Sequence, residues 1–105
     1  MRKKEGTEDL ELIHIKSLIE NGTIKRMRDL KDSSSTKIAR LAGINQGRYS
    51  SKLFNPGDFS VSEIVRISLV LGIEARYLSE IISKEITKEE VLRIESYTIK
   101  LKQGK

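Results

Sequence analysis

The sequence has no cysteine, one histidine and one proline among its 105 residues. The lack of cysteine excludes disulfides, thiolate metal sites and thiol nucleophiles. A single histidine, His14, provides no histidine cluster of the kind that binds zinc, and we expect neither a metal nor another cofactor. No apolar run approaches the roughly 18 residues that a membrane span needs. The opening MRKKEGTED has no apolar stretch behind it and is not typical of a signal peptide. We therefore expect a cytoplasmic protein without a membrane partner.

The combinations of residues that make a catalytic site are also missing. No glycine-rich phosphate loop follows a strand pattern, and no nucleophile has a matching base. The acidic residues are scattered as helix-surface charge, whereas a metal-dependent nuclease would need them clustered. A chain of this length also has little room for a large catalytic pocket. We expect no enzyme, no catalytic residue and no small-molecule ligand.

The sequence is rich in helix formers with apolar residues spaced by three and four, and no useful alternating strand pattern is present. This pattern predicts an all-α protein. The expected helices cover approximately residues 8–20, 23–30, 36–42, 45–54, 60–71, 74–83 and 87–101. Four side chains should cap helix N-termini, and three glycines should end helices in the left-handed conformation. The caps are Thr23, Asn45, Ser60 and Thr87, of which the last two open capping boxes with Glu63 and Glu90, and the glycines are Gly22, Gly43 and Gly72. The last hydroxyls of the serine run 33–35 should cap the helix that follows them.

The positive charge is concentrated in one third of the chain. The net charge is +5, and residues 23–54 hold eight Lys and Arg against two Asp, while the segments on either side are close to neutral. Such a patch attracts polyanions and releases their condensed counterions. A solvated surface without a partner has the same composition, so charge alone does not decide between these two interpretations.

The stretch IARLAGINQGRYSSKL, residues 38–53, lies inside this basic segment. A short helix, a three-residue turn that starts at Gly43 and a second short helix form a helix-turn-helix arrangement. Gly43 can adopt positive φ without a Cβ clash, and the small Ala39 lets the two helices approach. Ile44 and Tyr49 should point inward, with the Tyr49 hydroxyl reaching the surface.

Ala39, Gly43 four residues later and Tyr49 after six more are similar to the motif of the lambda-repressor-like helix-turn-helix family, of the Cro and xenobiotic-response-element type. The similarity continues through NPGDFSVSEIVRISLVLGIEARYL and covers residues 23–83. The resemblance implies a sequence-specific DNA-binding domain of five helices, frequently dimeric, that regulates transcription as phage repressors do. Residues 1–22, a tail and helix, and 84–105, a further helix, lie outside it.

Two residues depart from the family pattern. The family usually has an aliphatic residue where Tyr49 stands and an apolar one where Lys52 stands. Leu53 and Phe54 would then have to anchor the far end of this helix in the core.

A recognition helix meets base edges with its first two turns, while neighbouring groups hold the phosphates. Gly47 would allow a close approach to the duplex, or is only a tolerated first-turn glycine. Arg48 would contact guanine or phosphate, or is only an exposed arginine. The expected base contacts are Asn45, Gln46, Gly47, Ser50 and Ser51, and the expected backbone contacts are Thr36, Lys37, Arg48, Lys52, Asn55 and Ser60.

The last expected helix carries Val91, Ile94, Thr98 and Leu101 in a narrow stripe. It either folds back on the core of its own chain or pairs with a second copy, so that a homodimer reads two half-sites about one helical turn apart. The main alternative function is a protein-interaction module of the same fold, antitoxin-like or phage-derived. The polar, basic and small residues that predominate in 45–52 favour double-stranded DNA as the partner. A protein-binding groove would instead need aromatic or aliphatic anchors on this surface.

Overall fold

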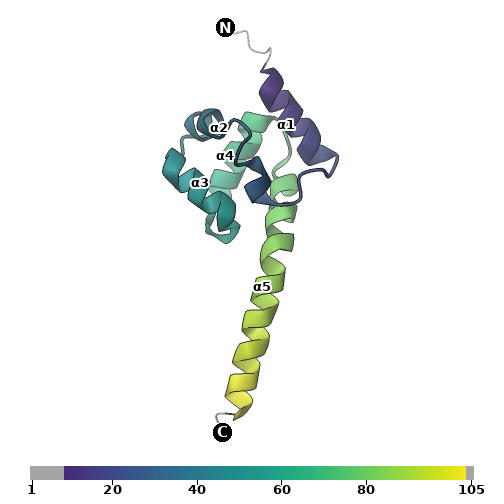
Figure 1. Cartoon of the computed structure of the whole chain (residues 1–105), viewed down its shortest axis with the longest axis vertical. Coiled ribbons are helices and arrows are strands. Elements are labelled where there is room, and N and C mark those ends of the chain that lie inside the picture. The colour runs from purple at the N-terminus through teal and green to yellow at the C-terminus, as the bar shows by residue number, and fades with distance from the viewer. Residues whose placement is uncertain (1–8, 104–105) are drawn as a thin grey trace.

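The computed structural model describes residues 9–103, and these residues form helices and connecting turns without any strand (Figure 1). The prediction of an all-α protein is confirmed for this part of the chain. The elements are α1 (Leu10–Glu20), the 3-10 helix η2 (Met27–Leu30), α2 (Ser35–Ala42), α3 (Gln46–Phe54), the 3-10 helix η3 (Pro56–Asp58), α4 (Val61–Leu71) and α5 (Ala75–Gln103).

Helices α1 to α4 and the first turns of α5 form a compact head around one apolar core (Figure 1). The rest of α5 projects away from the head, so that the molecule measures 66 × 28 × 21 Å. Each α-helix contributes two or three buried apolar residues to the core of the head. These include Ile15, Ile19, Ile38, Tyr49, Leu53, Ile67, Leu71 and Leu78.

Most of the helix ends lie where cap chemistry predicts them. The Asn45 side chain accepts a hydrogen bond from the Arg48 amide, and Ser60 and Glu63 form the expected capping box. Gly43 and Gly72 end α2 and α4 with φ of +69° and +74°. These positions were predictable because a cap depends on residues within one turn of the helix end.

The expected helix over residues 23–30 is wrong. Residues 23–26 do not form a helix, and only the 3-10 turn η2 follows, with Arg26 rather than Thr23 at its N-cap. The Asp29 carboxylate accepts a hydrogen bond from the Arg26 amide at 3.2 Å. The Met27 amide donates at 2.7 Å to Glu85, a residue of α5 that is 58 positions away. Because side chains satisfy these amides, the segment does not need a longer helix.

The expected break before Thr87 is also wrong, because α5 runs without interruption from Ala75 to Gln103. The Thr87 hydroxyl donates to the Ser83 carbonyl one turn earlier and does not cap a new helix. Residues 73–103 contain neither Gly nor Pro, so no residue there is a strong helix breaker. All residues from 87 to 102 are exposed, which excludes the expectation that this segment folds back on its own core.

Three side chains of α3 differ from expectation. The Tyr49 hydroxyl does not reach the surface but lies buried without a hydrogen-bond partner among the described residues. Leu53 anchors the helix as expected, whereas Phe54 is exposed and lies beneath the Arg28 guanidinium, 5.5 Å from it. The Tyr49 ring instead packs edge-on against Phe59, with 6.3 Å between the ring centroids. The far end of α3 is therefore held by Leu53 and not by Phe54.

Candidate nucleic-acid interface

The turn between α2 and α3 is fixed by backbone hydrogen bonds. The Gly43 amide donates to the Arg40 carbonyl at 3.1 Å, and the Ile44 amide donates to the Ala39 carbonyl at 2.9 Å. A Cβ at Gly43 would find open space, so the requirement for glycine comes from its positive φ. Ile44 is buried as predicted and holds the turn on the core.

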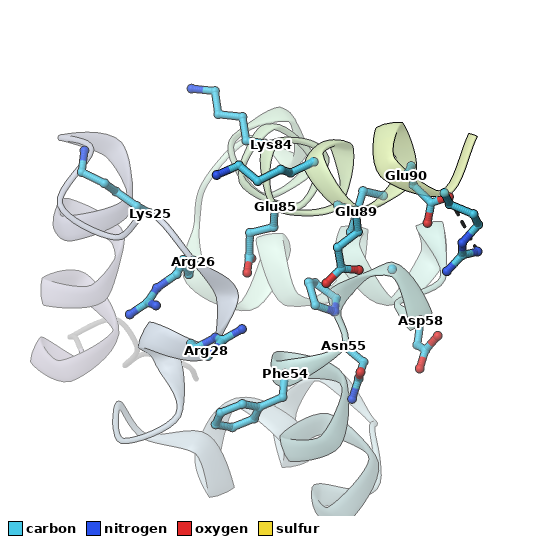
Figure 2. A pocket seen from close by; sticks show the side chains of 15 residues that line it. Lys25, Arg26, Arg28, Phe54, Asn55, Asp58, Lys84, Glu85, Glu89 and Glu90 are labelled. Atoms are coloured by element: carbon cyan, nitrogen blue, oxygen red, sulfur yellow. Dashed lines mark ion pairs between the residues drawn. The ribbon is translucent and has the colours of Figure 1, made fainter. Parts of the chain in front are cut away.

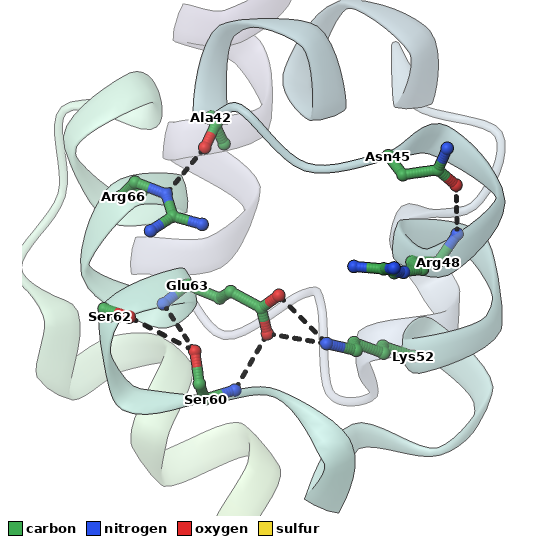
Figure 3. Close-up of polar contacts among 8 residues, drawn as sticks. All are labelled: Ala42, Asn45, Arg48, Lys52, Ser60, Ser62, Glu63 and Arg66. Carbon is green, nitrogen blue, oxygen red and sulfur yellow. Dashed lines mark hydrogen bonds and ion pairs between the residues drawn. The ribbon is translucent and has the colours of Figure 1, made fainter.

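A residue distant in sequence closes the turn from the other side. The Arg66 Nε on α4 donates to the carbonyl of Ala42, the last residue of α2, at 2.7 Å (Figure 3). This bond satisfies a carbonyl that the helix end leaves without an intrahelical partner. Sequence reasoning missed Arg66, because no local motif connects it to the turn.

The first turn of α3 is built on Asn45. Its Oδ1 accepts from the Arg48 amide at 3.0 Å (Figure 3). A Cβ at Gly47 would lie 3.2 Å from this same oxygen, which is closer than a comfortable contact. Gly47 thus has a local reason to lack a side chain, whether or not a duplex approaches the helix.

The residues predicted to contact bases share the outer face of the N-terminal half of α3. Asn45, Gln46, Gly47 and Ser51 are exposed, and Ser50 is half-buried. Tyr49 occupies the inner face of the same turns. The structure therefore brings this predicted set together on one polar surface.

Two of the predicted phosphate contacts, Lys52 and Ser60, are bonded to the carboxylate of Glu63. The Lys52 Nζ lies 2.9 Å from both carboxylate oxygens of Glu63, with the two side chains only 22% and 14% exposed. The Ser60 amide donates to the same carboxylate at 2.9 Å, and the Ser60 hydroxyl accepts from the Glu63 amide (Figure 3). The Ser60 amide and the Lys52 ammonium together hold the pKa of Glu63 below its usual value. Lys52 therefore holds α3 against α4 through Glu63, and the Ser60 amide is already bonded to the same carboxylate.

The N-terminus of α2 has no side-chain cap. Its N-cap residue, Ser34, has a φ of +57°, and its hydroxyl donates to Glu11. The Ser35 hydroxyl donates back to the carbonyls of Leu30 and Lys31. The expectation that the serine run caps α2 is therefore wrong. Within residues 9–103, no side chain accepts a hydrogen bond from the first amides of α2, and the nearby Thr36 is exposed.

Lys37 lies in this first turn but is already paired. Its Nζ is 2.8 Å from an Asp9 oxygen and 3.0 Å from a Glu11 oxygen, both at the start of α1. Hydrogen bonds from Lys37 lower the pKa of both carboxyls, and the carboxylates raise the pKa of Lys37. An incoming phosphate would have to replace these two carboxylates.

The other predicted contacts differ in how available they are. Arg48 on α3 and Arg40 on α2 are exposed and form no ion pair with any residue that the structure describes. Asn55 follows α3 and donates from its side-chain amide to the Ser51 carbonyl at 3.2 Å. Among the predicted contacts, Arg48 is thus an available cation on α3 itself.

A groove of about 810 Å³ lies between the end of α3, η2, η3 and α5, and the predicted phosphate contact Asn55 is one of its lining residues (Figure 2). Basic side chains such as Arg26 and Lys84 line it together with acidic ones such as Glu89 and Asp58. Because both signs of charge are present, the groove does not provide a continuous cationic surface for a duplex.

Residues 9–103 contain no group of three His, Asp or Glu side chains placed to hold a metal ion. No helix in the same part of the chain is long and apolar enough to cross a membrane. The chain matches no protein-family model, no curated protein and no solved structure.

Proposed function

We propose that this chain is a cytoplasmic, sequence-specific double-stranded DNA-binding protein that regulates transcription, with a helix-turn-helix of the lambda-repressor type formed by α2 and α3. The observation that carries the proposal is the outer face of α3, which is polar, exposed and nearly free of apolar side chains from Asn45 to Lys52. The helix is held on the core by the buried Tyr49 and Leu53, and the turn before it is closed by Gly43 and the Arg66 bond. This anchoring matters because base readout requires side chains to be held in position.

Base contacts would come from the first turn of α3 in the major groove. Gln46 can pair with adenine through two hydrogen bonds, and Ser51 can donate to or accept from several bases. Asn45 uses its Oδ1 in the cap, so its amide nitrogen is the group directed at DNA. Sequence preference should therefore depend most on Gln46.

Phosphate contacts would flank this face. The first amides of α2 have no side-chain acceptor among the described residues, and a phosphate is a suitable acceptor at a helix N-terminus. Arg48 on α3 and Arg40 on α2 supply positive charge that forms no ion pair with the described residues. Lys52 and Ser60 instead act as positioning residues through Glu63.

The alternative, a protein-interaction module of the same fold, has one observation in its favour. Val61, Val65 and Leu69 form an exposed apolar line along α4, with Val61 77% and Leu69 74% exposed. Apolar surface of this kind is common at protein interfaces. It lies on α4 and not on the outer face of α3, so it does not compete with the DNA-binding surface.

The proposal is tested by selecting bound sequences from a random duplex pool and then measuring binding by fluorescence anisotropy at several salt concentrations. Gln46→Ala should cost about 1–3 kcal/mol on the selected sequence and little on random duplex. Arg48→Ala should weaken binding to both and lower the salt slope by about 0.9. Arg93→Ala removes the same charge from the projecting part of α5 and serves as the matched control.

Binding that is absent or insensitive to salt would support the protein-interaction module instead. An equal loss on every duplex for Gln46→Ala and Arg48→Ala would contradict the separate roles assigned to these residues.

A further inference from the structure

The projecting half of α5, residues 87–102, buries no side chain in the core of the part of the chain that the structure describes. Every residue from 87 to 102 is exposed, and six of them are large apolar residues. Helices in proteins are stabilised mostly by packing an apolar face, and exposed apolar surface marks an interaction site. The six residues are Val91, Leu92, Ile94, Tyr97, Ile99 and Leu101.

The spacing of these residues matches a coiled-coil seam. Thr87, Val91, Ile94, Thr98 and Leu101 follow one another at alternating steps of four and three, which places them on one side of the helix. A second helix is therefore the shape that fits this face.

We propose that α5 pairs with α5 of a second copy of this chain, and that the two helices run antiparallel. The charges beside the seam decide the direction. In a parallel pair, Glu90 of one helix would face Glu95 of the other, twice, because these flanking positions meet across a parallel seam. In an antiparallel pair, Lys88 of each helix can face Glu95 of the other, which gives two attractive contacts.

The same charges also select the register of the antiparallel pair. Val91 lies opposite Ile94 of the second copy, and Thr87 lies opposite Thr98. A shift by seven residues in one direction brings Glu95 against Glu95, and a shift in the other direction brings Lys88 against Lys88. In the selected register, the projecting half of each α5 lies along that of the other for nearly its whole length.

This arrangement has a consequence that rests on the proposed DNA-binding function. With a helical rise of about 1.5 Å per residue, the two Ser83 positions, where the helices leave the heads, lie about 29 Å apart along the common axis. Half-sites on DNA are about 34 Å apart when they are separated by one helical turn. The points where the two helices leave their heads are therefore separated by a distance of the same order as the repeat of the duplex.

Association is measured without DNA, by sedimentation equilibrium on the full chain across a range of concentrations. The unaltered chain should form a dimer, Ile94→Lys should be monomeric, and Leu92→Lys should remain dimeric. Ile94 and Leu92 are 60% and 62% exposed, so neither substitution disturbs the core of the head, which circular dichroism checks. A monomeric unaltered chain, or a dimeric Ile94→Lys variant, would overturn the proposal. Either result would leave the DNA-binding measurements unaffected.

Charge reversal tests the direction of the helices. Lys88→Glu and Glu95→Lys should each weaken the dimer at least several-fold, and the double variant should restore it. In a parallel pair, Glu95→Lys alone would tighten the dimer by removing the contact with Glu90, and this result would overturn the antiparallel arrangement.

Cysteine crosslinking provides an independent measurement, since the chain has no cysteine of its own. A mixture of Thr87→Cys and Thr98→Cys chains should form a disulfide between the two variants, whereas Thr98→Cys alone should not crosslink. In the antiparallel register, the two Thr98 positions are about 16 Å apart along the axis, too far for a disulfide. Efficient crosslinking of Thr98→Cys with itself would instead show a parallel pair.

Discussion

Replacing Tyr49 by phenylalanine should stabilise the protein. The side chain has no exposed surface, and its hydroxyl has no hydrogen-bond partner among the described residues. Burying a hydroxyl without a partner costs about 1–3 kcal/mol relative to water. Phenylalanine retains the ring and its edge-on contact with Phe59, so the substitution removes the cost and keeps the packing.

The void left by the oxygen opposes this gain. A hydroxyl occupies less space than the roughly 30 Å³ of a water molecule, and cavities cost about 24 cal/mol per Å³, so the loss stays below about 0.7 kcal/mol. The net free energy of unfolding of Tyr49→Phe should therefore rise by about 0.5–2 kcal/mol. For a domain of this size, each kcal/mol corresponds to about 4–8 °C in Tm.

Urea unfolding followed by circular dichroism at constant protein concentration measures this difference. The midpoint should rise with an unchanged m-value. Tyr97→Phe, on the projecting part of α5 and 66% exposed, is the matched control and should change the free energy by less than about 0.5 kcal/mol. Destabilisation of Tyr49→Phe by more than this amount would show that the hydroxyl has a bonding partner, such as a buried water, and would refute the reasoning.

The same pair of proteins should diverge at high pH. Burial raises the pKa of Tyr49 above its ordinary value of 10.0 in the folded state. A raised folded-state pKa means that the contribution to stability is complete below pH 10 and is lost as the pH rises past the value in the unfolded chain. The difference between the urea midpoints of Tyr49→Phe and the unaltered chain should thus grow from pH 8 to pH 11. The titration of lysines changes the stability of both proteins equally, so it cancels in the difference between the two midpoints.

Three further predictions concern the interface and its supports. Replacing both Asp9 and Glu11 by their amides should release Lys37 from its two ion pairs. Binding to random duplex, measured by fluorescence anisotropy at low salt, should then become several-fold tighter. A variant that neutralises two exposed carboxylates of α5 has the same net charge and is the control. Glu63→Gln should lower the free energy of unfolding by about 1 kcal/mol at pH 7, because the capping box and the ion pair weaken together. Since the pKa of Glu63 is lowered in the folded state, this difference should shrink as the pH falls below its ordinary value of 4.5, and a difference independent of pH would contradict the role of the carboxylate. Gly43→Ala should destabilise the protein by about 1–2 kcal/mol in urea unfolding, because alanine is strained at a φ of +69°. An unchanged midpoint would mean that the turn is not left-handed.

The features that sequence reasoning predicted correctly are those that depend on neighbouring residues. The caps at Asn45 and Ser60 and the glycine stops at Gly43 and Gly72 each involve groups within about one helical turn. The inward positions of Ile44 and Tyr49 follow from the same local geometry. These parts of the head could therefore be predicted without knowledge of the tertiary contacts.

The error at Thr87 is local, whereas the error at residues 23–30 and the unexpected pairing of Lys37 and Lys52 arise because distant residues decide the outcome. The capping-box pattern at Thr87 is equally compatible with a helix interior, and the lack of any glycine or proline from 73 to 103 was the better signal. The amide of Met27 meets Glu85 only in the folded chain. Two predicted phosphate contacts, Lys37 and Lys52, are paired with carboxylates for the same reason: their partners Asp9 and Glu63 lie at other helices and are distant in sequence.

These ion pairs change the interpretation of the basic segment. Of its cationic side chains, Arg26, Lys37 and Lys52 are held by carboxylates, and Arg28 lies over Phe54. The charge available beside α3 is therefore smaller than the count of lysines and arginines in the sequence. Non-specific attraction to phosphates increases with the number of phosphates that a protein neutralises. If the chain binds DNA as proposed, fewer available cations would lower this non-specific attraction and leave the polar side chains of α3 unaffected. In the DNA-binding function that we propose, the carboxylates that pair with Lys37 and Lys52 would therefore favour discrimination between sequences at the expense of overall affinity for DNA.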